Sequence, residues 1–100
     1  MNITEVKIRI ANIIRKCAAQ ISPELLDVVS DDELIETFDL LTLKCKEKGV
    51  KHDGFTLIEA VVRKLSHDKL YPKIIDDTTK TSVDWIEHQM KFKKNRFGLF

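Results

Sequence analysis

Hydrophobic side chains recur every three or four positions along most of this chain, which is the spacing of one face of an α-helix. The opening segment, residues 3–21, shows the pattern most clearly, because its apolar side chains fall on one stripe. These are Ile3, Val6, Ile10, Ile13, Ile14, Cys17 and Ile21. The opposite side carries Arg9, Asn12, Lys16 and Gln20. The pattern therefore predicts an amphipathic helix over residues 3–21.

A second, smaller apolar face runs along the same segment, well away from the main stripe. It consists of Ile8, Ala11, Ala18 and Ala19. A helix that is apolar on two sides usually contacts two neighbours. We therefore expect part of this helix to lie in the core, and another part to meet a protein partner or a second copy of the chain.

Capping residues mark the start and end of the next two predicted helices. Ser22, followed by proline and glutamate, predicts a short helix that reaches about Val29. Ser30 and Glu33 have the spacing of a capping box, which opens the strongest helix of the chain. Its inner face is Leu34, Phe38, Leu41 and Cys45. Gly49 is expected to end it, since glycine readily adopts the left-handed conformation found at helix ends.

Start signals also occur in the second half of the chain. Thr56 with Glu59 predicts a second capping box, for a helix through residues 57–65, and Ser66 with Asp68 predicts a further helix start. These signals place at least one more helix after the turn that begins at Gly49.

The last part of the chain is predicted to hold a short helical turn and a final helix. Ile74 and Ile75 would anchor the turn, and Thr81 or Ser82 would cap the helix. The expected fold is all-α, a compact single domain of five or six helices over residues 1–94. Residues 95–100 lack periodicity and are expected to form a hydrophobic tail.

Composition narrows the possible functions. The chain has 100 residues, 43% of them hydrophobic, with 17 Lys and Arg against 16 Asp and Glu. The small net charge argues against a protein that holds nucleic acid by overall charge, and the hydrophobic content argues against a disordered chain. No apolar run approaches the roughly 18 residues of a membrane span.

Charge is unevenly distributed along the chain. Between residues 22 and 40 there are seven acids and no bases, whereas both ends are basic. Such segregation is consistent with charged partner surfaces, with complementarity inside the molecule, or with plain solvated helix faces.

The sequence contains no arrangement of residues typical of an enzyme. Glycine-rich phosphate loops, nucleophile elbows and the HExxH metal motif are all missing from it. His52 beside Asp53 is interpreted as a polar pair in a turn. Cys17 and Cys45 lie on apolar stripes, where cysteine behaves as a small hydrophobe. We predict no catalytic residue, no cofactor and no metal site, and unpaired thiols without a signal peptide suggest a cytoplasmic location.

The order and spacing of several segments over about residues 5–94 resemble the AsiA-type anti-sigma factors of T-even-like bacteriophages. The sharpest match is the turn Gly49-Val50-Lys51-His52-Asp53-Gly54. The isoleucine-rich first helix, the acidic stretch, the segment from Ala60 to Lys69, Ile74-Ile75-Asp76-Asp77 and the helix around Trp85 follow the family in the same order.

This resemblance implies a phage protein, acting in the cytoplasm of an infected bacterium, that binds region 4 of the primary sigma factor. In such proteins binding stops region 4 from recognising the −35 promoter element and redirects RNA polymerase, and the same surface closes a homodimer when sigma is absent. The positions that match the family's contact surface are Ile10, Ile14, Cys17, Ala18, Gln20, Ile21, Leu41 and Lys44. No membrane and no direct nucleic-acid contact are expected.

Two alternatives remain open at the level of sequence. The terminal Arg96-Phe97-Gly98-Leu99-Phe100 resembles short peptides that dock on DNA-polymerase sliding clamps, with Phe97, Leu99 and Phe100 as the docking side chains. The helices around residues 49–54 also allow a helix-turn-helix, with Lys51, Arg63 and Lys64 near phosphates. Against this second alternative, the would-be reading helix is mostly apolar.

Overall fold

The structure, a computed structural model, describes residues 3–71 and 77–96, the side chains of 93–96 aside. Over these residues the chain is all-α, as predicted. It forms α1 (Ile3–Ile21), the short 3₁₀ helix η1 (Pro23–Asp27), α2 (Asp31–Lys48), α3 (Gly54–Leu70) and α4 (Thr78–Arg96). The expected five or six helices are thus four α-helices and one 3₁₀ turn in the described part of the chain. The turn expected at Ile74 and Ile75 falls outside it.

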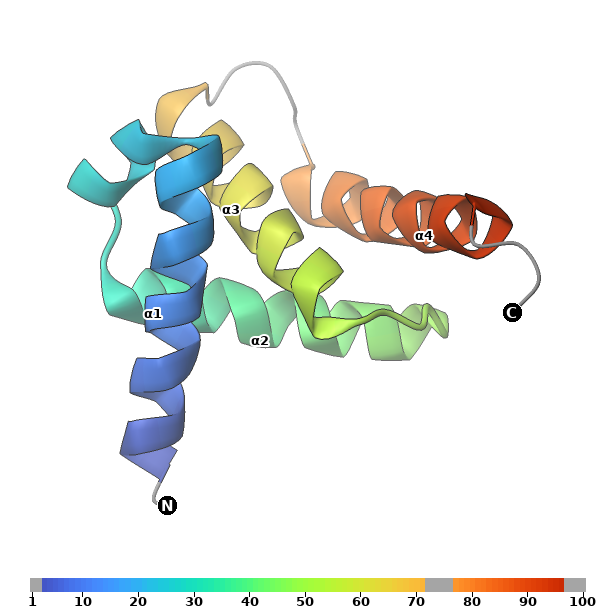
Figure 1. Ribbon diagram of the computed structural model, residues 1–100, viewed down its shortest axis with the longest axis horizontal. Coiled ribbons are helices and arrows are strands. Elements are labelled where there is room, and N and C mark those ends of the chain that lie inside the picture. Colours follow the sequence, from blue (N-terminus) through green and yellow to red (C-terminus); the bar gives the residue numbers. More distant parts are fainter. Residues whose placement is uncertain (1–2, 72–76, 97–100) are drawn as a thin grey trace.

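Helix α3 lies at the centre and packs against α1, η1, α2 and α4 (Figure 1). Its sequence suits this position because buried side chains occupy most of its circumference rather than one stripe. They are Thr56, Leu57, Ala60, Val61, Val62, Lys64 and Leu65. The surrounding helices therefore each cover a different side of α3, and together they bury one core.

The predicted ends of α2 are confirmed. The backbone N–H of Glu33 donates to Ser30 Oγ at 3.2 Å, and the N–H of Ser30 donates to Glu33 Oε1 at 3.2 Å. This is the reciprocal pair of a capping box. Gly49 has φ 75° and ends the helix in the left-handed conformation.

The start of α3 differs from the prediction. Asp53, rather than Thr56, caps the helix, because its Oδ1 accepts the N–H of Thr56 at 2.6 Å. Asp is as good a capping residue as Thr, and Gly54 and Phe55 can join the first turn, so the earlier cap prevails. Thr56 is buried, and the predicted partner Glu59 instead pairs with Arg63.

Two further predicted helix starts are wrong, and tertiary contacts explain one of them. Ser66 and Asp68 lie inside α3, where Asp68 binds Lys64 and Thr78 rather than capping a new helix. Helix α4 starts at Thr78, before Thr81 and Ser82, and the N–H of Lys80 donates to Asp77 Oδ1 at 3.0 Å. The helix then continues to Arg96, beyond the expected start of the tail at residue 95.

The short helix after α1 forms, but in a tighter geometry than predicted. Residues 23–27 are 3₁₀, and Ser22 makes no side-chain capping bond. A 3₁₀ turn is common where a connector is too short for a full α-helix.

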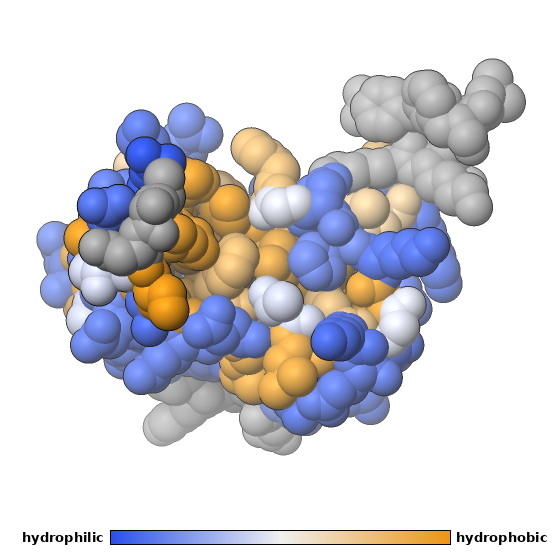
Figure 2. Space-filling view, turned by 90° about the horizontal axis from the view of Figure 1, so that it is seen from below, coloured by the Kyte–Doolittle hydropathy of each residue, from blue (hydrophilic) through white to orange (hydrophobic). Residues whose placement is uncertain are grey.

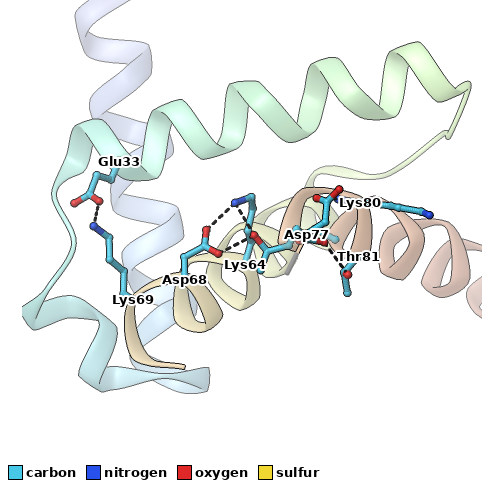
Figure 3. A network of polar contacts seen from close by, with 9 residues as sticks. Glu33, Lys64, Asp68, Lys69, Asp77, Lys80 and Thr81 are labelled. Carbon is cyan, nitrogen blue, oxygen red and sulfur yellow. Dashed lines mark hydrogen bonds and ion pairs between the residues drawn. The ribbon is translucent and has the colours of Figure 1, made fainter. Parts of the chain in front are cut away.

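Polar contacts join α2, α3 and α4 at one end of the core (Figure 3). Lys69 of α3 pairs with Glu33 of α2. Lys64 donates to Asp68 at 2.7 Å and to Thr78 Oγ1 at 3.0 Å, and Thr78 Oγ1 donates to Asp68 at 2.7 Å. This closed triad satisfies the charge of Lys64, whose side chain is only 10% exposed.

Candidate protein-binding surface

The first half of α1 projects from the body of the molecule (Figure 1). Residues 3–9 are all exposed, and among them Ile3 is 74% and Val6 41% exposed. Large apolar residues exposed together on one projecting helix are unusual for a surface that meets only water. This end of α1 is therefore the first candidate for contact with another protein.

Ala11, Ile14 and Ala18 form the side of α1 that lies in the core, and all three are fully buried. Two of these belong to the smaller apolar face that the sequence indicated. Alanine allows a neighbouring helix to approach closely, so this side of α1 fits against the body of the domain. The isoleucine stripe contributes only Ile14 to the fully buried core.

The remaining side chains of the stripe form a surface that no described element fully covers. We call it the α1 flank. It consists of Ile3, Val6, Ile10, Ile13, Cys17 and Ile21. Ile10 and Cys17 are partly buried, and the other four are exposed.

The positions of the α1 flank are spaced like the seam of a coiled coil. The steps from Ile3 to Val6, Ile10, Ile13 and Cys17 alternate three and four residues, which keeps the side chains facing one partner helix. Gln20 takes the next seam position. The flank therefore has the spacing that accepts a single helix laid along α1.

Basic side chains border the outer edge of the α1 flank. Arg9 and Lys16 occupy the positions just before Ile10 and Cys17, where coiled coils place the charges that select a partner. Both are exposed. The other edge, with Ala11 and Ala18, is closed by the core. A partner helix with acidic residues beside its apolar face is the best electrostatic match.

The end of the flank nearest α3 borders Glu59 and Arg63. Burial raises the pKa of the Cys17 thiol, Glu59 raises it further, and Arg63 opposes them. Cys17 is consequently a neutral, apolar contact at neutral pH rather than a reactive thiolate. The guanidinium of Arg63 lies 5.0 Å from the ring centre of Trp85, which holds it beside α4.

Figure 2 looks onto the projecting end of α1 from below. Hydrophobic surface extends from this end towards the middle of the face and is framed by hydrophilic side chains. Phe55, at the start of α3, is 75% exposed and is a further large apolar side chain outside the core. An apolar area with a polar frame is typical of protein interfaces.

The residues predicted to contact a partner separate into two groups. Ile14, Ala18 and Leu41 are fully buried, so they support the core in this conformation. The accessible members on α1 are Ile10, Cys17, Gln20 and Ile21. Lys44 is exposed on α2, where it lines a groove with residues of α4 instead of the α1 flank.

Three flank residues were missing from the predicted contact set. Ile3, Val6 and Ile13 are all exposed and all occupy seam positions. The three-four alternation was present in the sequence, but Ile14 interrupts it, so seam and core positions look like one stripe until the neighbouring helices are placed.

Ion pairs within the molecule account for part of the uneven distribution of charge along the sequence. Arg15 of the basic N-terminal segment pairs with Asp31 at 2.7 Å, and Lys69 pairs with Glu33. These contacts link two of the seven acids of residues 22–40 to bases elsewhere in the described chain.

The helix-turn-helix alternative receives little support from the geometry. Leu57, Val61 and Val62 of α3 are in the core, and Lys64 is buried in its triad with Asp68. A recognition helix needs several free polar side chains to reach base edges. The clamp-binding alternative concerns Phe97, Leu99 and Phe100, which lie outside the described residues.

Within the part of the chain that is described, no three metal-binding side chains gather at one place. The search for a membrane-spanning helix over the same residues finds none with the required length and hydrophobicity.

Comparisons with protein-family models, with curated proteins and with solved structures find no match to this chain. The resemblance to AsiA-type proteins therefore rests on the sequence segments described above.

Proposed function

We propose that this protein is an AsiA-type anti-sigma factor that binds region 4 of a bacterial primary sigma factor through the α1 flank. The observation that carries the proposal is the uncovered apolar seam on α1, with Arg9 and Lys16 along its open edge. The resemblance in the order of sequence segments supplies the identity of the partner. The expected setting is the cytoplasm of an infected bacterium.

The protein would act by occupying the surface of region 4 that otherwise recognises the promoter. A region 4 helix held along α1 would no longer be placed to read the −35 element, and RNA polymerase would lose ordinary promoters. No catalytic residue is needed for this action, because a stoichiometric complex is sufficient. In the absence of sigma, the same seam on a second copy would close a homodimer.

The test uses two isoleucines on opposite sides of α1. Ile13 lies on the flank, and Ile8 is equally exposed on the far side, at 50% and 51%. Ile13→Asp buries an unpaired charge in the proposed interface, so we expect affinity for a purified region 4 fragment to fall at least ~30-fold. Ile8→Asp adds the same charge outside the interface and should bind nearly as the parent protein does.

Isothermal titration calorimetry gives both affinities, and circular dichroism checks that each variant is folded. If the parent protein, shown to be folded, does not bind region 4, the proposed function is wrong. If Ile13→Asp binds as tightly as Ile8→Asp, then region 4 uses another surface.

A further inference from the structure

A groove lies between the turn that joins α2 to α3 and the second half of α4, at the other end of the molecule from α1 (Figure 1). We call it the α4 groove. The described residues that line it are Gly49, Val50, Lys51, Glu87, Met90 and Lys91. Its volume is about 350 Å³, which leaves room for a large side chain, since one water takes up about 30 Å³ in the liquid. Helices α1 and α4 do not pack against each other, so the groove is separate from the α1 flank.

The end of α2 fixes one side of the α4 groove. After Gly49 turns the chain, the N–H of Val50 donates to the carbonyl oxygen of Cys45 at 2.8 Å. Such a bond is typical of helix ends in which the residue after a left-handed glycine packs back against the helix. Val50 is 8% exposed, and Met90, on the α4 side, is half-buried. The groove therefore has an apolar floor whose position is set by the backbone.

Two lysines border the floor, one from each side. Lys51 belongs to the turn and Lys91 to α4, both are exposed, and neither forms an ion pair with another described residue. The hydrocarbon part of a lysine side chain can extend an apolar surface while its ammonium group stays in water. The sequence around Lys91 adds positive charge, because residues 88–96 include four bases and no acid. The α4 groove is thus apolar at its floor and positive at its rim.

Glu87 is the one acid among the described residues that line the groove, and it opposes an incoming carboxylate. Its Oε1 contacts Lys48 Nζ at 3.7 Å, which offsets part of its charge. The two unpaired lysines therefore leave the rim with an excess of positive charge. Glu87 also gives a directional test, because neutralising it should strengthen binding of an anionic segment and weaken binding of a cationic one.

An apolar floor with a positive rim complements a segment whose apolar side chain is flanked by acids. Among the described residues no aromatic side chain lines the groove, so it offers nucleic-acid bases no ring to stack on. We propose that the α4 groove docks a segment of a partner protein that carries a large aliphatic side chain between aspartates or glutamates. This surface would hold its partner independently of the α1 flank, and the proposal does not depend on sigma region 4.

The experiment uses as its probe an acetylated tetrapeptide amide with two leucines between two glutamates. Amide chemical shifts of the full chain are followed during its titration, and a matched peptide with glutamine in place of both glutamates is titrated in parallel. We expect saturable shifts at residues 49–51 and 87–91 with the acidic peptide. The glutamine peptide should bind about 5-fold more weakly, because it lacks the charges that pair with the lysines.

Variants of the protein assign the binding to the groove. Lys51→Gln and Lys91→Gln should each weaken binding of the acidic peptide by about 2–5-fold, which is the effect of one exposed ion pair. Glu87→Gln should strengthen it. The control Lys7→Gln removes an exposed lysine on the projecting half of α1 and should leave binding unchanged. Circular dichroism checks that each variant is folded.

Several results would overturn the proposal. These are the absence of shifts in the groove with the acidic peptide, equal binding of the glutamine peptide, and parent-like binding by both lysine variants. A short DNA duplex titrated in parallel, and dilution of the protein alone, then show whether nucleic acid or a second copy occupies the groove instead. Region 4 binding through the α1 flank is measured separately, and its failure would leave each of these outcomes unchanged.

Discussion

Ile13 and Ile14 are neighbours in the sequence, yet one is 50% exposed and the other is fully buried. Successive residues of a helix are 100° apart, so the boundary between core and flank passes between them. The same residue type thus has two roles on α1. Ile14 stabilises the fold, and Ile13 is available to a partner.

This difference gives a paired stability prediction. Ile14→Ala leaves a cavity in the core and should lower the free energy of unfolding by about 2–5 kcal/mol. Ile13→Ala removes an exposed side chain and should change it by less than about 0.5 kcal/mol. Urea unfolding followed by circular dichroism measures both, and similar losses in the two variants would mean that α1 is rotated relative to this structure.

Among the helices, the ends that depend on residues close together in the sequence were predicted correctly, and the others were not. Ser30, Glu33 and Gly49 act through their own backbone neighbourhood, and the sequence predicted them correctly. The start of α3 was misplaced because Asp53 and Thr56 are both acceptable caps, and the choice depends on whether Thr56 is buried. Asp68 was misread because its partner Thr78 is distant in sequence.

The two glycines around the α2–α3 turn provide a test at this scale. Gly49 has positive φ, and no atom beyond the adjoining backbone lies within 4 Å of a Cβ built on it, so Gly49→Ala should lower stability by about 1 kcal/mol through backbone strain alone. Gly54 is the first residue of α3 and also has space for a Cβ. Gly54→Ala should be neutral, or stabilising by about 0.4–1 kcal/mol.

Thermal unfolding of the parent protein and of the two alanine variants measures these changes in stability. A loss of stability for Gly54→Ala as large as that for Gly49→Ala would argue that the turn itself, rather than the left-handed residue, limits substitution.

In the molecule as a whole, ion pairs between different helices connect side chains that are far apart in sequence. Lys69 of α3 holds Glu33 of α2, and Lys48 of α2 holds Asp84 of α4 at 2.7 Å. The hydrogen bond from Lys69 lowers the pKa of Glu33, and that from Lys48 lowers the pKa of Asp84. The bond to Asp84 in turn raises the pKa of Lys48.

These shifts predict how stability depends on pH. A carboxyl with a lowered folded-state pKa stabilises the protein above its ordinary pKa, about 4 for Asp and Glu, and loses that contribution as the pH falls through the lower value. Acid should therefore destabilise the fold, and Glu33→Gln or Asp84→Asn should make the loss shallower. Glutamine at position 33 still completes the capping box, so α2 is kept.

Urea midpoints measured from neutral to acidic pH test this expectation. Lys69→Gln removes the largest cause of the Glu33 shift but leaves the hydrogen bond from Ser30, so it should flatten the acid dependence less than Glu33→Gln does, and the double variant should match Glu33→Gln. High salt should reduce all these effects, because the pairs are exposed. An unchanged acid dependence in Lys69→Gln would contradict the role given to this pair.

The helical class, the span of α1, the capping box of α2 and its glycine end could all be predicted from the sequence, since they depend on residues a few positions apart. It also showed that α1 has apolar residues on more than one side. The packing of the helices was needed to show that Ala11, Ile14 and Ala18 face the core, while Val6 and Ile13 remain uncovered. Periodicity identifies an apolar face but not its neighbour, and the neighbours of α1 are placed by the wide apolar surface of α3, which lies more than thirty residues further along the chain.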